Sequence, residues 1–236
     1  MISEILQKWC SENNILISDT QKQKFETYAK LLIEWNEKIN LTAITEENEV
    51  AVKHFIDSIT LLKYASIKDG ASVVDIGTGA GFPGIPLKIM RDDINLTLLD
   101  SLNKRLVFLD EVCNTIDIKA ETVHYRAEEG GQNPNFREKY DVAVSRAVAN
   151  LPALCEYCMP YVKVGGVFIS MKGSDGENEL ENAKTAISTL GGKTEKCETL
   201  TLPDGSTRTI ITIKKTTPTP KKYPRRSVKI NKQPIL

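Results

Sequence analysis

The sequence contains few of the residues from which disulfide-bonded and metal-binding proteins are built. Its 236 residues include five cysteines, an odd number without the spacing of a disulfide framework, and two histidines, His54 and His124. Cys155 and Cys158 form a C-x-x-C pair, but there is no second pair, and both lie inside a helical pattern where zinc and redox motifs are not expected. We therefore expect a reducing compartment, no disulfides and no metal ion.

Long apolar runs are also missing. No stretch approaches the roughly eighteen apolar residues that a membrane-spanning helix needs. The first residues, MISEILQKWC, have neither a cationic start before a long apolar core nor a small-residue cleavage site. Hydrophobic residues make up 41% and charged residues 26% of the chain, as is usual for soluble globular proteins. These features predict a cytoplasmic protein that is not attached to a membrane, and we expect it to be monomeric.

The formal net charge of zero hides an uneven distribution of charge. Residues 205–236 contain nine basic residues and no acidic one, which leaves the rest of the chain acidic. A basic tail indicates a polyanionic partner such as nucleic acid, because Lys and Arg gain affinity by releasing counterions from phosphates. A solvated, disordered terminus would have the same composition.

The first 64 residues are expected to form a helical extension. Residues 1–12 have an amphipathic pattern, and a second helix is expected from Ser18 to about Asn36, beginning with a capping box of Ser18 and Gln21. Its large apolar side chains recur at helical spacing, which predicts that they pack against the main domain: Phe25, Tyr28, Leu32 and Trp35.

A third helix is expected over about residues 46–64. It brings His54, Asp57 and Ser58 within one turn, so that all three can face the same way. Such a group is either a hydrogen-bonded structural cluster or a ligand contact, and we favour the structural cluster.

Alternating strands and helices follow, and they predict a parallel sheet with helices on both faces. Strands are expected at residues 71–76, 95–100, about 120–125, 140–145 and 166–171, and helices at residues 83–91, 103–115, 150–159 and 177–190. Residues 195–202 and 207–214 also have strand patterns, and the Pro-Asp-Gly-Ser link between them favours an antiparallel hairpin. The predicted architecture is a Rossmann-like α/β fold with a seven-stranded, mostly parallel sheet that ends in this hairpin.

The chain is thus expected to have three parts. Residues 1–64 are the helical extension, residues 65–215 the main domain, and residues 216–236 a basic tail. Prolines alternate with Lys and Arg in the tail, so we expect it to be extended, solvated and flexible, without a core of its own.

Glycines are concentrated after the first expected strand of the sheet. The stretch ASVVDIGTGAGFPG (71–84) has the pattern of a buried strand that turns into a helix, with glycines at 77, 79, 81 and 84. Because glycine permits tight turns and close approach of the backbone to a ligand, the stretch predicts a cradle for a nucleotide-like ligand. The part GAGFPG also satisfies the dinucleotide fingerprint, with Asp100 about twenty residues further on. The C-terminal hairpin and Asp75 favour an S-adenosylmethionine-dependent methyltransferase over a dehydrogenase, since dinucleotide-binding folds continue with a sixth parallel strand and usually have an apolar residue at that position.

Several stretches of the chain resemble one family. They are WNEKINLT (35–42), KHFIDSI (53–59), DIGTGAGFPGIPLKI (75–89), LLDSLNKRLVFL (98–109), RAEE (126–129), YDVAVSRAVANL (140–151) and MKG (171–173). In these motifs the chain resembles the bacterial 16S (small-subunit) ribosomal RNA guanine-N7 methyltransferases of the RsmG family, also called glucose-inhibited division protein B. The resemblance implies a class I methyltransferase fold, S-adenosyl-L-methionine as cofactor with S-adenosyl-L-homocysteine as product, and 16S ribosomal RNA or a small-subunit assembly as partner. Some family members have a basic ending of this kind and others stop before it.

The resemblance also implies roles for individual residues. The glycine loop would approach the methionine end of the cofactor, Asp100 would accept hydrogen bonds from both ribose hydroxyls, and Arg146 would be a catalytic residue close to the ligand. The complete set of implied cofactor-binding residues is Asp75, Gly77, Gly79, Gly81 and Phe82 in and before the loop, Asp100, Ala127 and Glu128 at the ribose and adenine, and Arg146.

The implied reaction needs little acid–base chemistry. Guanine N7 has an in-plane lone pair and loses no proton when it is methylated, so positioning is the main task of the enzyme. We therefore expect Arg146 and Lys172 to orient RNA or ligand and not to transfer protons. Two alternatives stay open: a methyltransferase that acts on another acceptor, and an rRNA-binding assembly factor without catalysis. The tail is expected to add electrostatic affinity for RNA and to leave cofactor binding unchanged.

Overall fold

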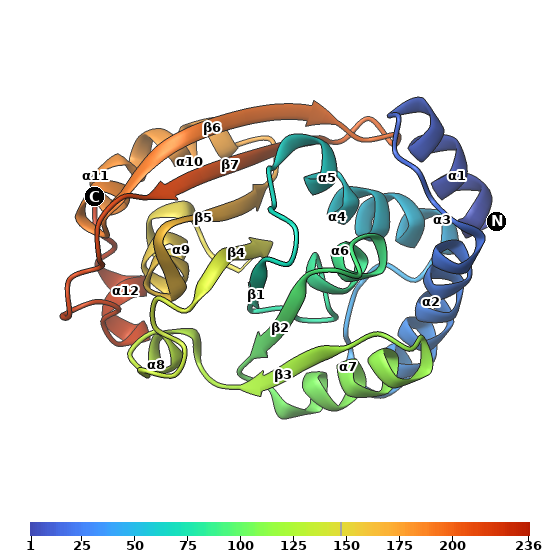
Figure 1. Ribbon diagram of the computed structural model, residues 1–236, viewed down its shortest axis with the longest axis horizontal. Helices are drawn as coiled ribbons and strands as arrows, with labels where there is room; N and C mark the ends of the chain where they lie inside the picture. Colours follow the sequence, from blue (N-terminus) through green and yellow to red (C-terminus); the bar gives the residue numbers. More distant parts are fainter. Residues whose placement is uncertain (147) are drawn as a thin grey trace.

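The computed structural model describes residues 1–146 and 148–236. Its centre is a seven-stranded sheet in the order β3-β2-β1-β4-β5-β7-β6 (Figure 1). The strands are β1 (Ser72–Ile76), β2 (Asn95–Asp100), β3 (Ala120–His124), β4 (Tyr140–Arg146), β5 (Val162–Lys172), β6 (Gly192–Thr201) and β7 (Thr207–Lys215). Strands β1 to β5 run parallel to one another, whereas β7 is antiparallel to both β5 and β6. The predicted sheet, mostly parallel and ended by an antiparallel hairpin, is confirmed.

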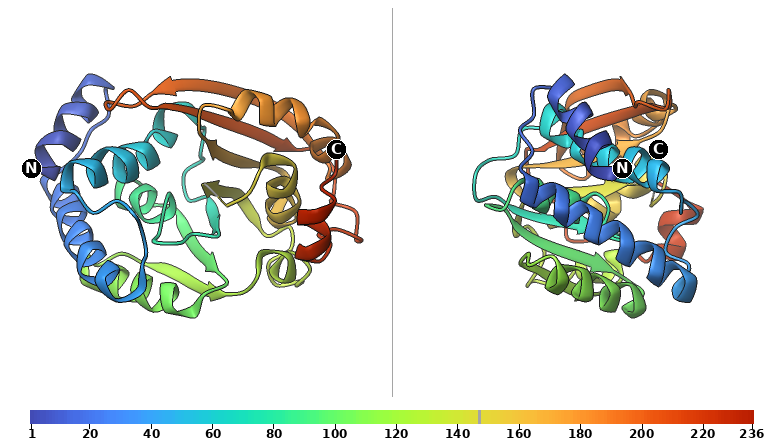
Figure 2. Two further views of the ribbon diagram at one scale, coloured as in Figure 1. Left: turned by 180° about the vertical axis from the view of Figure 1, so that it is seen from behind. Right: turned by 90° about the vertical axis from the view of Figure 1, so that its right-hand side faces the viewer.

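Helices cover both faces of the sheet and form two hydrophobic cores (Figures 1 and 2). Successive strand residues point to opposite faces, so Val73 belongs to one core and Val74 to the other. The first core is shared with α6 (Gly84–Met90), α7 (Asn103–Thr115) and the N-terminal helices, and the second with α9 (Leu151–Cys158) and α11 (Lys184–Thr189). The remaining short helices of this part are α8 (Ala127–Gly130), a 3-10 turn η2 (Met159–Tyr161) and α10 (Gly176–Asn182). Within the described residues, no helix is long and apolar enough to cross a membrane.

Several elements have bounds that differ from the sequence prediction, among them one helix and the fifth strand. The helix expected at residues 177–190 is divided into α10 and α11, and β5 begins at Val162 instead of residue 166. The strand passes through Gly165 and Gly166 as a bulge, where the pairing with β4 shifts register. Gly165 has a φ of +88°, and a Cβ on Gly166 would lie 2.5 Å from the carbonyl oxygen of Asp141, so both positions require glycine.

The N-terminal helices α1 (Ile2–Glu12) and α2 (Asp19–Ile39) lie at one end of the molecule, where α2 packs against α6 and α7 and α1 packs against α2 (Figures 1 and 2). The predicted capping box is present, since the Ser18 amide donates to Gln21 Oε1 (2.8 Å) and the Gln21 amide donates to Ser18 Oγ (3.2 Å). Tyr28 is fully buried, packs on the Phe82 ring with centroids 5.5 Å apart, and donates its hydroxyl to the carbonyl of Ala80. Tyr28 thus packs against the glycine loop and Trp35 packs on Phe108 of α7, with ring centroids 5.7 Å apart, so the predicted packing of this face on the main domain is confirmed.

The third N-terminal helix is continuous but irregular. Its segments are α3 (Glu47–Glu49), a π-helical stretch η1 (Val50–Ile56), α4 (Asp57–Ile59) and α5 (Leu61–Tyr64). His54, Asp57 and Ser58 are all buried. Since π-helical turns are rare and frequently occur at functional sites, Lys53 and His54 in this stretch are candidate functional residues.

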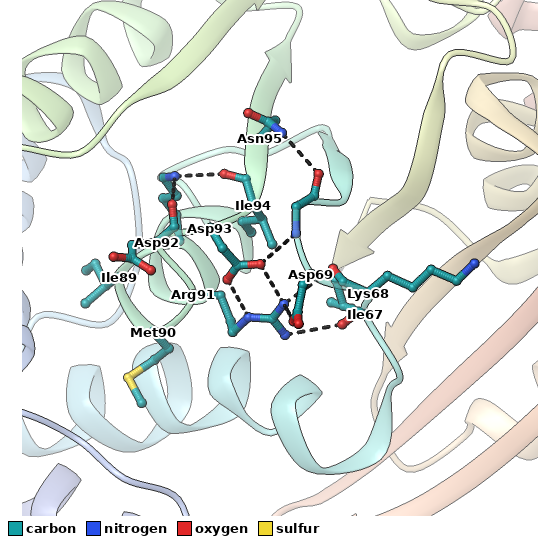
Figure 3. Close-up of polar contacts among 12 residues, drawn as sticks. Ile67, Lys68, Asp69, Ile89, Met90, Arg91, Asp92, Asp93, Ile94 and Asn95 are labelled. Atoms are coloured by element: carbon teal, nitrogen blue, oxygen red, sulfur yellow. Dashed lines mark hydrogen bonds and ion pairs between the residues drawn. The ribbon is translucent and has the colours of Figure 1, made fainter.

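The segment before β1 is held to the end of α6 by Arg91 (Figure 3). The guanidinium forms two bonds to the Asp93 carboxylate (2.6 and 2.8 Å) and one to Asp69 (3.0 Å), and it also donates to the carbonyls of Ile67 and Lys68. These contacts, with the bond that Asp93 accepts from the Gly70 amide, lower the pKa of the Asp93 carboxyl far below its usual value. The cluster fixes the start of β1, which is the end of this strand opposite to the glycine loop.

The C-terminal segment, residues 216–236, differs from the extended, solvated tail that the sequence predicted. It contains a helix, α12 (Ser227–Lys232), and buries Tyr223 and Ile230 in the second core. Arg225 forms a bidentate ion pair with Glu156 on α9, whose side chain is fully buried. The prediction was wrong because Tyr223 and Ile230 are isolated apolar residues among prolines and lysines and form no recognisable pattern. Glu156, the buried partner of Arg225, lies 69 positions away in the sequence.

Candidate active site

A cavity of about 630 Å³ opens at the carboxyl ends of the parallel strands, where such sheets place ligands. It is bounded by the ends of β1, β2 and β4 and by the segment after β3. Seven of the nine residues expected to bind the cofactor line it: Gly77, Gly79, Phe82, Asp100, Ala127, Glu128 and Arg146. The structure therefore brings seven of the nine residues together around one cavity.

The glycine loop forms one wall because its backbone adopts positive φ angles. Gly77 and Gly79 have φ of +69° and +61°, and the amides of Gly77 and Thr78 both donate to the carbonyl of Leu99 at the end of β2. A Cβ on Gly77 would lie 2.8 Å from Val148, whereas a Cβ on Gly79 would approach only the Gly77 carbonyl, at 4.0 Å. The loop thus presents bare backbone to the cavity, which a side chain at either position would obstruct.

Asp75 and Gly81 are the two expected residues that do not line the cavity. Asp75 is fully buried beneath the loop, where its Oδ2 accepts from Thr78 Oγ1 (2.8 Å) and from the Gly84 amide (2.9 Å), and burial raises the pKa of Asp75 to about 6. Gly81 has a φ of +96°, and a Cβ there would lie 2.6 Å from Tyr28 Oη. The structure places both residues where they hold the shape of the loop.

Asp100 lies between the glycine loop and α7 and is almost completely buried. Its Oδ2 accepts from the Gly79 amide (2.9 Å) and from Arg105 (3.3 Å), and its Oδ1 accepts from the Leu102 amide (2.9 Å). A carboxylate has about four acceptor positions, so at least one remains beside the cavity, and a second becomes free if the half-buried Arg105 moves away. Asp100 therefore suits a hydroxyl-bearing ligand such as a ribose.

Arg146, at the end of β4, joins the cavity to the π-helical stretch. Its guanidinium donates to Asp57 Oδ2 (3.0 Å) and to the Lys53 carbonyl (3.0 Å), and it lies 4.9 Å from the centre of the Phe82 ring. Arg146 also lies 3.3 Å from His54 Nδ1, and the His54 ring stacks on Phe82 at 4.5 Å. The expected hydrogen-bonded cluster is present, since Ser58 donates to the His54 carbonyl (2.6 Å), but His54 and Asp57 are connected through Arg146 and hold the arginine in the wall of the site.

The imidazole of His54 is neutral in this setting. Its Nδ1 accepts from Arg146, and its Nε2 lies 2.8 Å from Thr42 Oγ1. Burial, followed by the neighbouring charge of Arg146, lowers the pKa of His54 to about 3. Both ring nitrogens already have partners, so His54 positions Arg146 and is not available to accept a proton.

A second cavity of about 640 Å³ adjoins the first and shares its wall of His54, Arg146, Val148 and Ala149. Its cationic residues are Lys53, Arg146, Lys172 and Arg208. Arg208 donates to the same Asp57 oxygen as Arg146 (3.2 Å), and Lys172 pairs with Glu179 (2.7 Å) and donates to the Ala149 carbonyl. The sequence did not predict that Lys53 and Arg208 lie at the site. Arg208 does belong to the basic residues 205–236 that the charge distribution had indicated.

The C-x-x-C pair takes no part in either cavity. Cys155 and Cys158 are both fully buried on α9, and burial raises the pKa of each thiol far above its usual value. The protonated thiols therefore pack as small apolar side chains.

The sheet order, the reversed last strand, the glycine loop and the acid at the end of β2 define a class I S-adenosylmethionine-dependent methyltransferase. Solved structures with this fold include TYW2 of M. jannaschii in complex with AdoMet, with a TM-score of 0.53 and 14% identity over 68% of this chain and 76% of that chain. Precorrin-6y C5,15-methyltransferase of Geobacter metallireducens has a TM-score of 0.51 and 17% identity over 73% and 90%. At these identities the likeness concerns the fold.

The particular family follows from the sequence comparisons. The GidB family model, described as rRNA small subunit methyltransferase G, matches residues 21–210. Proteins named ribosomal RNA small subunit methyltransferase G are 50% identical in Alkaliphilus metalliredigens, over 98% of both chains, and 48% identical in Staphylococcus carnosus, over 99% of this chain and 98% of that protein. A protein of the same name in Lachnoclostridium phytofermentans is 53% identical over 92% and 90%. The chain belongs to this family, and the resemblance seen in its motifs is confirmed.

Proposed function

We propose that the protein transfers a methyl group from S-adenosyl-L-methionine to N7 of a guanine in 16S ribosomal RNA. The observation that carries the proposal is the pair of adjoining cavities with Arg146 in their common wall. The first cavity is lined by glycine backbone and a buried acid, and the second by four cationic side chains together with the carboxylates of Asp57 and Glu179. A methyl donor and a polyanionic acceptor need sites of these two kinds side by side. The names of the relatives support ribosomal RNA of the small subunit as the acceptor.

The residues of the first cavity fit the cofactor. Bare backbone at Gly77 and Gly79 admits the methionine portion, and Asp100 offers acceptor oxygens for ribose hydroxyls. Ala127 and Glu128 stand after β3, where the adenine is expected. When bound, S-adenosylmethionine supplies the electrophilic methyl group. The chain itself contributes a site whose donors and acceptors are fixed before the ligand arrives.

The residues of the second cavity fit an RNA segment that carries the target base. Arg146 and Arg208 both donate to Asp57 Oδ2, so their guanidinium groups are held in place before RNA binds. Positive charge of this kind binds phosphates and acceptor edges of bases. Because His54 has both ring nitrogens engaged, the wall shared by the cavities offers no imidazole base. Guanine N7 requires none, since it has a free lone pair and loses no proton.

The alternative of an assembly factor without catalysis is disfavoured by the same residues. A protein that no longer bound the cofactor would have no need to keep both Gly77 and Gly79 at positive φ and an open cavity beside Asp100. We expect the enzyme to act as a monomer in the cytoplasm and without a metal ion.

Tritiated S-adenosylmethionine tests the proposal. The protein is incubated with small-subunit particles, with free 16S rRNA and with 23S rRNA, all from cells that lack the gene. We expect label in one or both of the 16S substrates and none in 23S rRNA. Label in 23S rRNA alone would show a different acceptor, and no label in any RNA despite cofactor binding would favour the assembly factor.

A further inference from the structure

The C-terminal segment forms part of the first cavity. Ser227 and Asn231 lie one turn apart on α12 and line the cavity together with Tyr157 from α9. Tyr157 donates its hydroxyl to Asn231 Oδ1 (3.2 Å), which fixes the side-chain amide. Among the described residues, no side chain or backbone group accepts a hydrogen bond from the amide nitrogen of Asn231. The amide therefore has donors available to a ligand in the cavity.

The C-terminal segment, residues 216–236, is folded against the main domain. Arg225 pairs with the fully buried Glu156 through bonds of 2.7 to 3.1 Å, and Ile230 on α12 is fully buried. Arg137 donates to the carbonyls of Thr219 (2.7 Å) and Tyr223 (2.8 Å) and so ties the chain before α12 to the main domain. A buried bidentate ion pair holds its partners firmly, because separating them would leave a charge without a partner in the core.

The position of α12 assigns it to the adenosine end of the cavity. Figure 1 shows α12 beside α8 and α9, at the opposite end of the molecule from α1 and α2. The helix α8 begins with Ala127 and Glu128, the residues expected at the adenine. Tyr161, in the turn η2 that follows α9, donates its hydroxyl to the Ala127 carbonyl (2.7 Å). The glycine loop, expected at the methionine end, lies on the other side of Asp100.

We propose that Asn231, assisted by Ser227, binds the adenine of the cofactor, so that the C-terminal segment is a cofactor-binding element. The proposal rests on the proposed function, which places S-adenosylmethionine in this cavity. Adenine has ring-nitrogen acceptors beside an exocyclic amino donor, and a side-chain amide or hydroxyl complements such an edge. Both side chains are neutral, so this part of the affinity does not depend on salt, unlike the contribution of the lysines and arginines in the same segment.

The test measures binding of S-adenosyl-L-homocysteine by isothermal titration calorimetry to the full chain and to point variants. Asn231→Ala should raise Kd about five- to tenfold, and Asn231→Asp should raise it more because an acceptor replaces the donors. Val228→Asp is the matched control, since Val228 is 64% exposed on the same helix and the variant introduces the same charge away from the cavity. It should bind within about twofold of the wild type.

A second ligand separates the two ends of the cavity. The ligand 5′-methylthioadenosine keeps the adenosine and lacks the amino acid end, so Asn231→Ala should weaken both ligands by the same factor. Equal binding by wild type and both Asn231 variants, or equal losses in the Asn231 and Val228 variants, would overturn the proposal while leaving the proposed function intact. Failure of the wild type to bind S-adenosyl-L-homocysteine would instead overturn the proposed function and this inference together. Asn231 is exposed on a helix surface, and an unchanged thermal midpoint shows that the variants fold.

Discussion

Replacing Arg146 with alanine removes the residue shared by the two cavities. The change deletes three hydrogen bonds, to Asp57 (3.0 Å), to the Lys53 carbonyl (3.0 Å) and to His54 Nδ1 (3.3 Å), and the contact with the Phe82 ring. Asp57 keeps Arg208 as a partner, so its buried carboxylate is not left without a counter-ion. The main loss should therefore be the fixed geometry between the cavities, and the fold should survive.

The expected magnitude follows from this loss of alignment. A misplacement of about 1 Å between reacting groups can reduce the rate about a hundredfold, which corresponds to about 2.7 kcal/mol in the activation free energy. We expect the single-turnover rate of methyl transfer to 16S rRNA, measured with saturating RNA and cofactor, to fall by about this factor in Arg146→Ala. The Kd of S-adenosyl-L-homocysteine should change only a few-fold, because the other cavity residues stay in place.

Arg208→Ala is the matched control, since Arg208 donates to the same Asp57 oxygen but lines only the second cavity. It should weaken RNA binding and retain most of the single-turnover rate at saturating RNA. A full single-turnover rate in Arg146→Ala would refute the role assigned to Arg146, and equal rate losses in both variants would show that the arginines act only through RNA affinity.

Three further predictions concern the stability of the site and of its surroundings, measured as the free energy of unfolding in urea. Gly81→Ala should lose about 2–4 kcal/mol, because a Cβ would meet Tyr28 Oη at 2.6 Å at a φ of +96°, whereas Gly205→Ala, with a φ of +81° and open space, should lose only about 1 kcal/mol. The lowered pKa of His54, about 3, means that the unfolded chain binds one more proton between pH 3 and 6.5, so stability is lost as the pH falls below 6.5. At pH 5 this loss is about 2 kcal/mol, and His54→Gln should lack it; an identical pH profile in the variant would contradict the prediction. Asp93→Asn should lose at most about 1 kcal/mol, since the pair with Arg91 is partly exposed, and Glu181→Gln, in the exposed pair with Lys184, should show no measurable loss.

The centre of the sheet could be predicted because β1, β2 and β4 are short, largely apolar runs that end in a polar residue or a turn. The strand and helix expected at residues 95–100 and 103–115 have those bounds in the structure. The hairpin could be predicted from the turn residues between its two strands. The glycine loop could be located for the same reason, since four glycines after a buried strand have few structural alternatives.

Contacts between distant parts of the chain could not be predicted in this way. The bond between Asp57 and Arg146 joins residues 89 positions apart, and the pair of Glu156 and Arg225 joins residues 69 apart. Neither pairing has a local pattern, so the sequence favoured a structural cluster over a ligand contact for His54 and Asp57, and it predicted a solvated C-terminal tail. Asp75 was assigned to the ligand by its position before the glycines, whereas its burial beneath the loop depends on Thr78 and Gly84 bonding back to it.

The central claim is methyl transfer to guanine N7 in 16S rRNA, and the nucleoside product tests it most directly. The 16S rRNA from cells lacking the gene is incubated with the protein and S-adenosylmethionine, digested to nucleosides, and analysed by liquid chromatography and mass spectrometry. The account predicts a gain of 7-methylguanosine, of about one residue per 16S molecule, that Arg146→Ala does not produce in the same time. A methyl group on another nucleoside or another guanine atom, or no gain of methylated nucleoside by a protein that binds the cofactor, would contradict it.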